Sequence, residues 1–196
     1  LFFGGNVSDS FLTNTLEILR KRGPTWIVFT EDDARVRDLP EGYSFIIERV
    51  EFNSNNLSNE RVSSQLPTNC RLAEMDLSLL EDCDWVEGVK RAYGSLDNFL
   101  AYGFGICLLQ EDQILSEAYA MFEGAGRVEL GVATREEHRG RSYASIACSE
   151  LIRRCRNLNK PVYWSCDRNN VPSVKLAKRL GFLDERNYRW ILYKAT

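Results

Sequence analysis

The chain has 196 residues, of which 44% are hydrophobic and 11% aromatic, enough to fill the core of one large domain or two small ones. No apolar run approaches the roughly 20 residues needed to cross a bilayer, and the opening segment lacks the basic flank and the length of a signal peptide. A net charge of -3 and a pI near 5.4 argue against a nucleic-acid-binding protein. We therefore expect a cytoplasmic protein with no nucleic-acid or membrane partner.

Charge is distributed unevenly along the chain. Residues 67–134 carry 4 basic and 12 acidic side chains, whereas residues 135–194 carry 14 basic and 6 acidic ones. A positive C-terminal part is suited to a small polyanionic ligand, and an acidic middle part to a cationic one. Two solvated faces of opposite charge would produce the same pattern, so charge alone does not establish a ligand.

The six cysteines form no C-x-x-C pair, and the chain is too long to depend on disulfides. The single histidine, His138, lies in a charged turn far from any paired thiols, which argues against a zinc site. We expect no metal, and we interpret the cysteines as buried thiols in a reducing compartment.

The first 66 residues are expected to form a small N-terminal α+β domain. Its predicted elements are a helix over 10–22, ended by a Gly-Pro pair, and strands over 26–30 and 43–50. A stretch rich in Asn and Ser follows at 53–69 and is typical of a linker. We place the domain boundary there, which gives domains 1–66 and 67–196.

The second domain alternates between strands and helices. Its predicted elements are a strand over 70–75, a helical region over 76–93, strands over 99–109, 113–122 and 128–133, a helix over 142–157, a strand over 161–166, a helix over 172–180 and a strand over 188–194. This order predicts an α/β (α+β) fold whose functional residues lie where strands end and helices begin.

The loop 139–144 is the strongest candidate for an anion site. A strand that runs through a short turn into a helix places free backbone N–H groups and the positive helix end at one point. Arg139 and Arg141 add side-chain charge, and Gly140 lets the backbone approach a phosphate without a Cβ in the way.

The run from Val128 to Ala144 resembles the fourth strand and the Arg/Gln-x-x-Gly-x-Gly/Ala pyrophosphate loop of the GNAT N-acetyltransferase superfamily. Arg139 opens that motif and Ala144 closes it. Ser142 stands where a second glycine is usual, so one backbone amide is expected to be less accessible than in the family pattern.

A second segment, 170–182, is similar to the other cofactor segment of that superfamily, in which the residue at Asn170 contacts the pantetheine arm and the helix ends at Gly-Phe. An ordinary helix with an Asn cap, a proline in its first turn and a glycine at its end would explain this segment taken alone. It would not explain the pairing with the first segment in the expected order and at the expected separation.

The resemblance covers the chain from about residue 70 to its end, and it is greatest to the bacterial branch that includes zwittermicin-resistance-type acetyltransferases, whose members carry an extra N-terminal α+β domain. It implies the GNAT fold, a mixed central sheet flanked by helices with strands splayed at the cofactor site. It also implies transfer of an acetyl group from acetyl-CoA (coenzyme A) to a primary amine of a small molecule. The cofactor-binding residues that it implies are Val132, Ala133, Thr134, Arg139, Gly140, Arg141, Ser142, Tyr143, Ala144, Asn170 and Ser173.

Direct attack of an amine on a thioester needs a proton acceptor and often a donor for the leaving thiolate. Glu129 is the candidate base, because it is a carboxylate in an otherwise apolar strand three residues before the expected acetyl position at Val132. An outward-facing or salt-bridged strand residue is the alternative interpretation. Many family members have a tyrosine where this chain has Ala177, so Tyr188 is the candidate acid, with Tyr163 and Ser173 as alternatives.

The acceptor amine is expected over the acidic middle part, near residues 79–99. A non-catalytic coenzyme A-binding sensor or interaction module is the alternative function, because Ala177 and Ser142 depart from the family pattern. Two roles are open for residues 1–66, part of the acceptor pocket or a homodimer surface.

Overall fold

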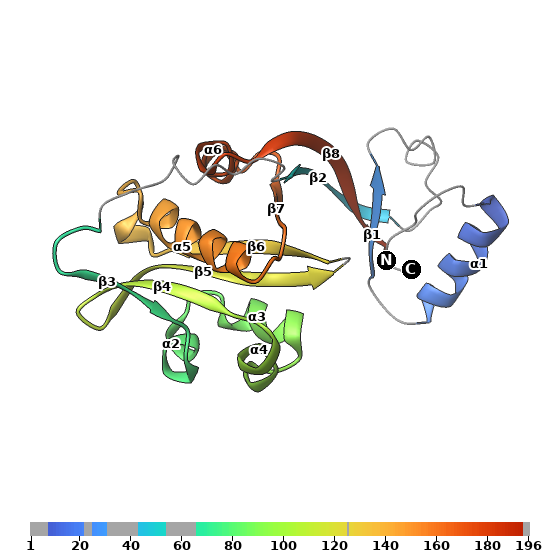
Figure 1. The fold of residues 1–196 in the computed structure, drawn as a ribbon. Helices are drawn as coiled ribbons and strands as arrows, with labels where there is room; N and C mark the ends of the chain where they lie inside the picture. Colours follow the sequence, from blue (N-terminus) through green and yellow to red (C-terminus); the bar gives the residue numbers. More distant parts are fainter. Residues whose placement is uncertain (1–7, 22–24, 31–42, 54–65, 125, 194–196) are drawn as a thin grey trace. The chain divides into compact units, whose positions relative to one another are not determined.

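The computed structural model describes residues 8–21, 25–30, 43–53, 66–124 and 126–193, and the chain forms two compact units (Figure 1). The smaller unit comprises Leu1–Glu51, Cys166–Val171 and Glu185–Thr196, and the larger one comprises Phe52–Ser165 and Pro172–Asp184. The Gly-Pro pair at 23–24 and most of the Asn- and Ser-rich stretch lie outside the described residues.

The described part of the smaller unit contains a helix and strands next to one another in the sheet. Helix α1 (Asp9–Arg20) begins after Ser8, whose side chain accepts a hydrogen bond from the Phe11 backbone N–H. Strand β1 (Thr25–Thr30) pairs antiparallel with β8 (Leu183–Tyr193), and β8 lies next to β2 (Tyr43–Asn53). The strand predicted over 188–194 begins earlier, at Leu183, although the charged residues 184–186 lack the apolar pattern of a strand.

The larger unit is built on a mixed sheet with the strand order β7-β6-β5-β4-β3. Its strands are β3 (Cys70–Glu74), β4 (Gly105–Gln110), β5 (Gln113–Gly124), β6 (Arg127–Thr134) and β7 (Val162–Asp167). The pairs from β3 to β6 are antiparallel, and β7 runs parallel to β6. A parallel neighbour needs a crossover, which the helix between β6 and β7 provides.

Helices cover both faces of this sheet (Figure 1). Helices α2 (Leu77–Asp82), α3 (Val86–Tyr93) and α4 (Leu96–Tyr102) lie on one face, and α5 (Tyr143–Asn157) lies on the other. Helix α6 (Val171–Leu180) follows β7. Each face has its own apolar cluster, one that includes Leu80, Val89 and Phe99 and one that includes Leu108, Leu115 and Ile146.

The predicted strand 99–109 was wrong in its first half, because residues 96–102 form α4. Ser95 caps this helix by accepting a hydrogen bond from the Asn98 backbone N–H at 3.1 Å, and Phe99 is fully buried beneath it. The apolar run that suggested a strand therefore begins within a short capped helix, in which Phe99 is buried. The predicted helical region 76–93 is divided into α2 and α3 by a turn at residues 83–85.

A buried carboxylate fixes that turn to the sheet. Glu117 on β5 is 1% exposed and accepts hydrogen bonds from the backbone N–H groups of Asp84 and Trp85, each at 3.1 Å. Arg135, which follows β6, also forms ion pairs with Asp82 at 2.8 Å and with Asp84 at 3.7 Å. The turn is thereby attached to β5 and to the residue that follows β6.

Glu117 should make the stability of the protein depend on pH. Burial raises the pKa of the Glu117 carboxyl above its ordinary value of 4.5, so above that value the folded state holds a proton that the unfolded state releases. The free energy of unfolding of the wild-type protein, relative to a Glu117→Gln variant, should therefore fall as the pH rises from 4.5 through the folded-state pKa. Urea unfolding of both proteins across this range measures the difference.

Glu117→Ala, which removes both acceptors, should lower the free energy of unfolding by about 2–5 kcal/mol, with the largest loss at low pH. The opposite result would contradict this account. If the free energy of unfolding of the wild-type protein rose with pH relative to that of the Gln variant, the folded state would favour the charged carboxylate.

Candidate functional site

Strands β6 and β7 separate within the sheet. Their parallel ladder contains two residue pairs, Val128 with Val162 and Glu129 with Tyr163, although β6 continues to Thr134 and both strands lie wholly within the described residues. On its other side, β6 stays paired with β5 as far as Thr134. The backbone groups of β6 that face β7 beyond Glu129 therefore have no ladder partner in β7. This edge is suited to bind an extended ligand through main-chain hydrogen bonds.

The loop after β6 has two residues in the left-handed region of backbone conformation. Gly140 has a φ of +79°, and Ser142 has a φ of +65° with a ψ of 12°. A residue with a Cβ is disfavoured in this region by about 1–2 kcal/mol. This conformation gives a physical reason why glycine is usual at the position of Ser142.

Helix α5 begins directly after Ser142, which makes no side-chain hydrogen bond to the first turn of the helix. The Ser142 hydroxyl instead accepts a hydrogen bond from Nη1 of Arg179 on α6, at 3.2 Å. The first backbone N–H groups of a helix have no partner inside the helix. The side chain of Ser142 therefore does not cap these groups of α5.

A cleft of about 330 Å³ lies between this loop and α6. It contains six of the residues predicted to bind the cofactor, namely Thr134, Arg139, Gly140, Ser142, Tyr143 and Ala144. Its other lining residues are His138, Ser145, Pro172, Lys175, Leu176 and Arg179. All of them belong to the larger unit. The two halves of the cleft come from segments more than 25 residues apart in the sequence.

The cleft is electropositive. Arg139, Lys175 and Arg179 line it, and its lining, all of it in the described part of the chain, includes no Asp or Glu. Nε of Arg139 donates to the carbonyl oxygen of Thr134 at 3.2 Å, which fixes the guanidinium at the end of β6. Three cations together with the positive end of a helix make this a site for a polyanion.

Lys175 and Arg179 were not among the predicted site residues. They lie one turn apart on the predicted helix 172–180, so the i, i+4 spacing placed them on one face. What the sequence did not show is that this face lies against the loop 139–144. His138, which the sequence analysis considered only as a metal ligand, also lines the cleft.

Four other predicted cofactor residues of the larger unit do not line the cleft. Val132 and Ala133 lie on β6 in the part that has separated from β7, next to Thr134. Arg141 is exposed in the loop. Ser173 on α6 accepts a hydrogen bond from Nε1 of the buried Trp164 at 3.0 Å, which ties α6 to β7.

Two more predicted residues, Asn170 and Tyr188, belong to the smaller unit. The backbone N–H of Asn170 donates to the carbonyl oxygen of Asp167 at 3.0 Å, within the turn that precedes α6. The hydroxyl of Tyr188 on β8 accepts a hydrogen bond from Nε of Arg49 at 3.3 Å.

Glu129, the candidate base, is half-buried and held by a neighbouring strand. The hydroxyl of Tyr163 on β7 donates to Oε2 of Glu129 at 2.9 Å. The guanidinium carbon of Arg127 lies 4.7 Å from the centre of the Tyr163 ring. Ala177, at the position where the family resemblance implies a tyrosine, is fully buried, and its side chain has no hydroxyl.

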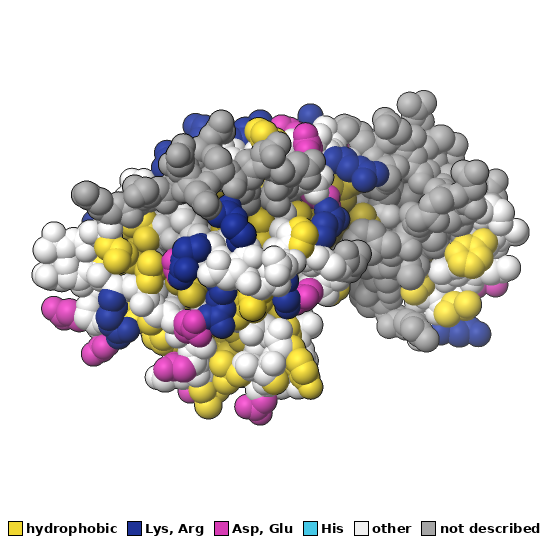
Figure 2. All heavy atoms as spheres, in the orientation of Figure 1, with side chains coloured by type: hydrophobic (Ala, Val, Ile, Leu, Met, Phe, Trp, Pro, Cys, Tyr) yellow, Lys and Arg dark blue, Asp and Glu magenta, His cyan; other side chains and the backbone are white. Residues whose placement is uncertain are grey.

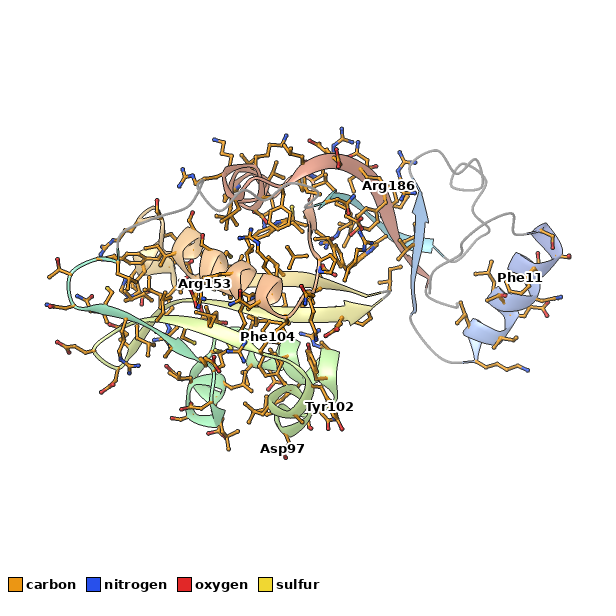
Figure 3. The ribbon with its side chains drawn as sticks, in the orientation of Figure 1. Phe11, Asp97, Tyr102, Phe104, Arg153 and Arg186 are labelled. Atoms are coloured by element: carbon orange, nitrogen blue, oxygen red, sulfur yellow. The ribbon has the colours of Figure 1, made fainter. Side chains whose placement is uncertain are left out.

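Within the acidic middle part, residues 76–102, which contain α2, α3 and α4, carry six acidic and two basic side chains. Figure 2 shows some of the Asp and Glu side chains of the larger unit where Figure 1 shows these helices. Figure 3 shows Asp97 and Tyr102 on α4 pointing away from the sheet, and Tyr102 is 75% exposed. Arg135, the residue directly after β6, forms an ion pair with Asp82 at the end of α2. This ion pair connects the face of α2, α3 and α4 to the end of β6.

Four of the five cysteines of the larger unit are buried, namely Cys83, Cys107, Cys148 and Cys155. Burial raises the pKa of Cys155 to about 12, so this thiol stays protonated near neutral pH. Over the described residues, no group of three or more His, Cys, Asp or Glu side chains could hold a metal ion. The described helices include none that is long and apolar enough to span a membrane.

Sequence comparisons with known proteins identify similarity to acetyltransferases. A family model described as GNAT acetyltransferase matches residues 1–191. The chain is 29% identical over 126 residues to the uncharacterized N-acetyltransferase YdfB of Bacillus subtilis (strain 168). This match covers 63% of the chain but 48% of that protein, so the chain spans about half the length of its curated relative.

Solved structures show the same architecture. A GCN5-related N-acetyltransferase-like protein from Streptococcus suis 89/1591 superposes with a TM-score of 0.72 at 22% identity, over 96% of this chain and 78% of the other. A GCN5-related N-acetyltransferase from Kribbella flavida superposes with a TM-score of 0.67 at 13% identity, over 100% and 78%.

These likenesses confirm the predicted fold class, a mixed sheet flanked by helices with strands that separate at the candidate site. The assignment to the zwittermicin-resistance-type branch stays a prediction. The match of a single family model to nearly the whole chain is decisive for the broader assignment. The chain belongs to the GNAT acetyltransferase family.

Proposed function

We propose that this protein is an N-acetyltransferase that transfers the acetyl group of acetyl-CoA to a primary amine of a small molecule by direct attack. The observation that carries the proposal is the electropositive cleft in which the loop 139–144 meets α6. Membership of the GNAT acetyltransferase family supports acetyl transfer as the reaction.

The residues of the cleft fit the diphosphate part of coenzyme A. A Cβ added to Gly140 would meet no atom within 4 Å, so the space beside this backbone is open to a ligand. The backbone N–H groups at the start of α5 and the side chain of Arg139 would bind the pyrophosphate. Lys175 and Arg179 would neutralise the remaining phosphate charge from the side of α6.

The edge of β6 that has separated from β7 would hold the pantetheine arm. We propose that the backbone of Val132, Ala133 and Thr134 forms hydrogen bonds with the amides of this arm and with the thioester carbonyl. Asn170 and Ser173 complete the proposed cofactor set, as the family resemblance implies. Acetyl-CoA would supply the activated acetyl group as a thioester.

Glu129 is the proposed base. Its carboxylate would accept the proton that the amine nitrogen loses on forming the new C–N bond, while the C–S bond breaks and the thiolate leaves. Tyr188 is the proposed proton donor to that thiolate, because Ala177 cannot serve. A thiol with an ordinary pKa of about 8.5 is also a tolerable leaving group without a donor.

The acidic face of α2, α3 and α4 favours a cationic amine as the acceptor. We further propose a cytoplasmic protein in which residues 1–66 form a domain of their own beside an acetyltransferase domain at 67–196. That first domain would complete the acceptor pocket or form a homodimer surface.

The direct test of the proposal is the release of free thiol from acetyl-CoA in the presence of a panel of primary amines. Amine-dependent release supports the enzyme. Binding of acetyl-CoA without release for any amine would instead support the alternative, a coenzyme A-binding sensor or interaction module, for which the loss of the family tyrosine at Ala177 argues.

Replacement of Gly140 by Ala should weaken acetyl-CoA binding by about tenfold or more, because the added Cβ would occupy the space through which a phosphate approaches the backbone. Gly126→Ala is a matched control. Gly126 has a φ of +73° and open space around it as well, but it lies in the turn between β5 and β6, away from the cleft.

Both variants should lose about 1–2 kcal/mol of stability from the strained backbone, but only Gly140→Ala should lose affinity. Calorimetric titration with acetyl-CoA measures this. Equal affinities of the two variants would show that the cofactor does not bind at the loop.

Replacement of Glu129 by Gln should lower kcat by about 100-fold or more, while the KM for acetyl-CoA changes little. The control is Glu123→Gln, which removes an exposed carboxylate from β5 that is paired with Lys160 at 2.6 Å. Initial rates with an accepted amine measure both variants. An unchanged kcat in the Glu129 variant would exclude this residue as the base.

A further inference from the structure

We infer that Tyr163 is a positioning residue for the base, and that Arg127, Tyr163 and Glu129 act as one assembly in which the tyrosine hydroxyl holds the carboxylate of Glu129 in its working orientation. This inference rests on the proposed function. It gives Tyr163 a different role from the proton donor that the sequence analysis considered.

The backbone brings these two residues together at the point where the strands separate. Glu129 and Tyr163 are Cα partners in the second pair of the β6–β7 ladder, beyond which β6 continues without a partner in β7. Residues paired across two strands point to the same face of the sheet. The pair therefore stands at the start of the opening in which Val132 is proposed to hold the acetyl group.

The side chains are joined directly. The hydroxyl of Tyr163 donates to Oε2 of Glu129 at 2.9 Å, and both residues are half-buried. A hydrogen bond to a carboxylate in such a place favours the charged form and limits rotation of the side chain. A base needs both properties, because it must be unprotonated and correctly oriented when the amine attacks.

Arg127 holds the tyrosine in turn. Its guanidinium carbon lies 4.7 Å from the centre of the Tyr163 ring, within the range of a cation–π contact. Its Nη1 donates to Oδ1 of Asn53 at 2.7 Å, which fixes the guanidinium in place. Arg127 and Glu129 are two residues apart on β6, so they share a face of the sheet with the ring between them.

The direction of the hydrogen bond argues against Tyr163 as the donor to the leaving thiolate. Its hydroxyl proton points to Glu129, and a proton committed to the base is not placed to protonate sulfur. The tyrosine therefore acts through Glu129.

Tyr163→Phe tests the inference, because it removes the hydroxyl and keeps the ring that Arg127 covers. With acetyl-CoA and an accepted amine, kcat should fall about tenfold and the KM for acetyl-CoA should stay within about twofold. The acidic limb of the kcat profile against pH should move to higher pH, because the charged carboxylate loses a hydrogen bond.

A double-mutant cycle separates positioning from an independent role. If Tyr163 acts through Glu129, Tyr163→Phe should have no further effect on kcat in a Glu129→Gln background. Ser149→Ala is the control. Its hydroxyl is also part-buried and donates at 2.6 Å, but to the backbone carbonyl of Ser145 within α5, so its loss should leave the acidic limb in place.

Equal losses of kcat on Tyr163→Phe in the wild-type and Glu129→Gln backgrounds would overturn the inference, and so would an acidic limb that does not move. Either result leaves the proposed function intact. Absence of amine-dependent turnover in the wild-type protein would refute the proposed function and this inference together. Thermal unfolding of every variant shows whether a loss of kcat reflects a loss of fold.

Discussion

The separation of β6 from β7 is the constraint on which the rest of the site depends. A sheet normally satisfies the backbone groups of a strand on both edges, whereas β6 keeps its β5 ladder to Thr134 and has its last β7 pair at Glu129. The edge that this leaves needs hydrogen-bond partners, which an extended ligand can provide. Glu129 stands just before the opening and the loop 139–144 lies beyond its end, so the proposed base and the proposed anion site are placed by the same strand.

The anion site depends on an unusual backbone as well as on its cationic side chains. Two residues of the loop have positive φ, and Ser142 adopts this conformation although it has a Cβ. Its hydroxyl bonds to Arg179 rather than to the first turn of α5, so the serine does not occupy the amides that a phosphate would use. The departure from the family motif therefore adds strain, but it also ties the loop to a cation on α6.

Local chemistry made part of the site predictable. The strand, the Arg-Gly-Arg turn and the helix that follows are contiguous, so the sequence indicated the loop at 139–144 and, with the second segment, the fold. Contacts between distant segments were not predictable in this way. The bond from Tyr163 to Glu129 depends on the parallel register of β6 and β7, and the place of Arg179 depends on how α6 packs. The apolar run at Phe99 was misinterpreted as a strand because its pattern does not distinguish a short buried helix from a buried strand.

The central claim, that the loop at the start of α5 binds the pyrophosphate of coenzyme A beside the open edge of β6, can be tested most directly by NMR. Coenzyme A would be titrated into the ¹⁵N-labelled protein while the backbone amide signals are followed. The account predicts the largest shifts at Gly140, Ser142 and Tyr143, with a second group at Val132 and Ala133. Saturable shifts confined to other parts of the chain, with these amides unchanged, would contradict it.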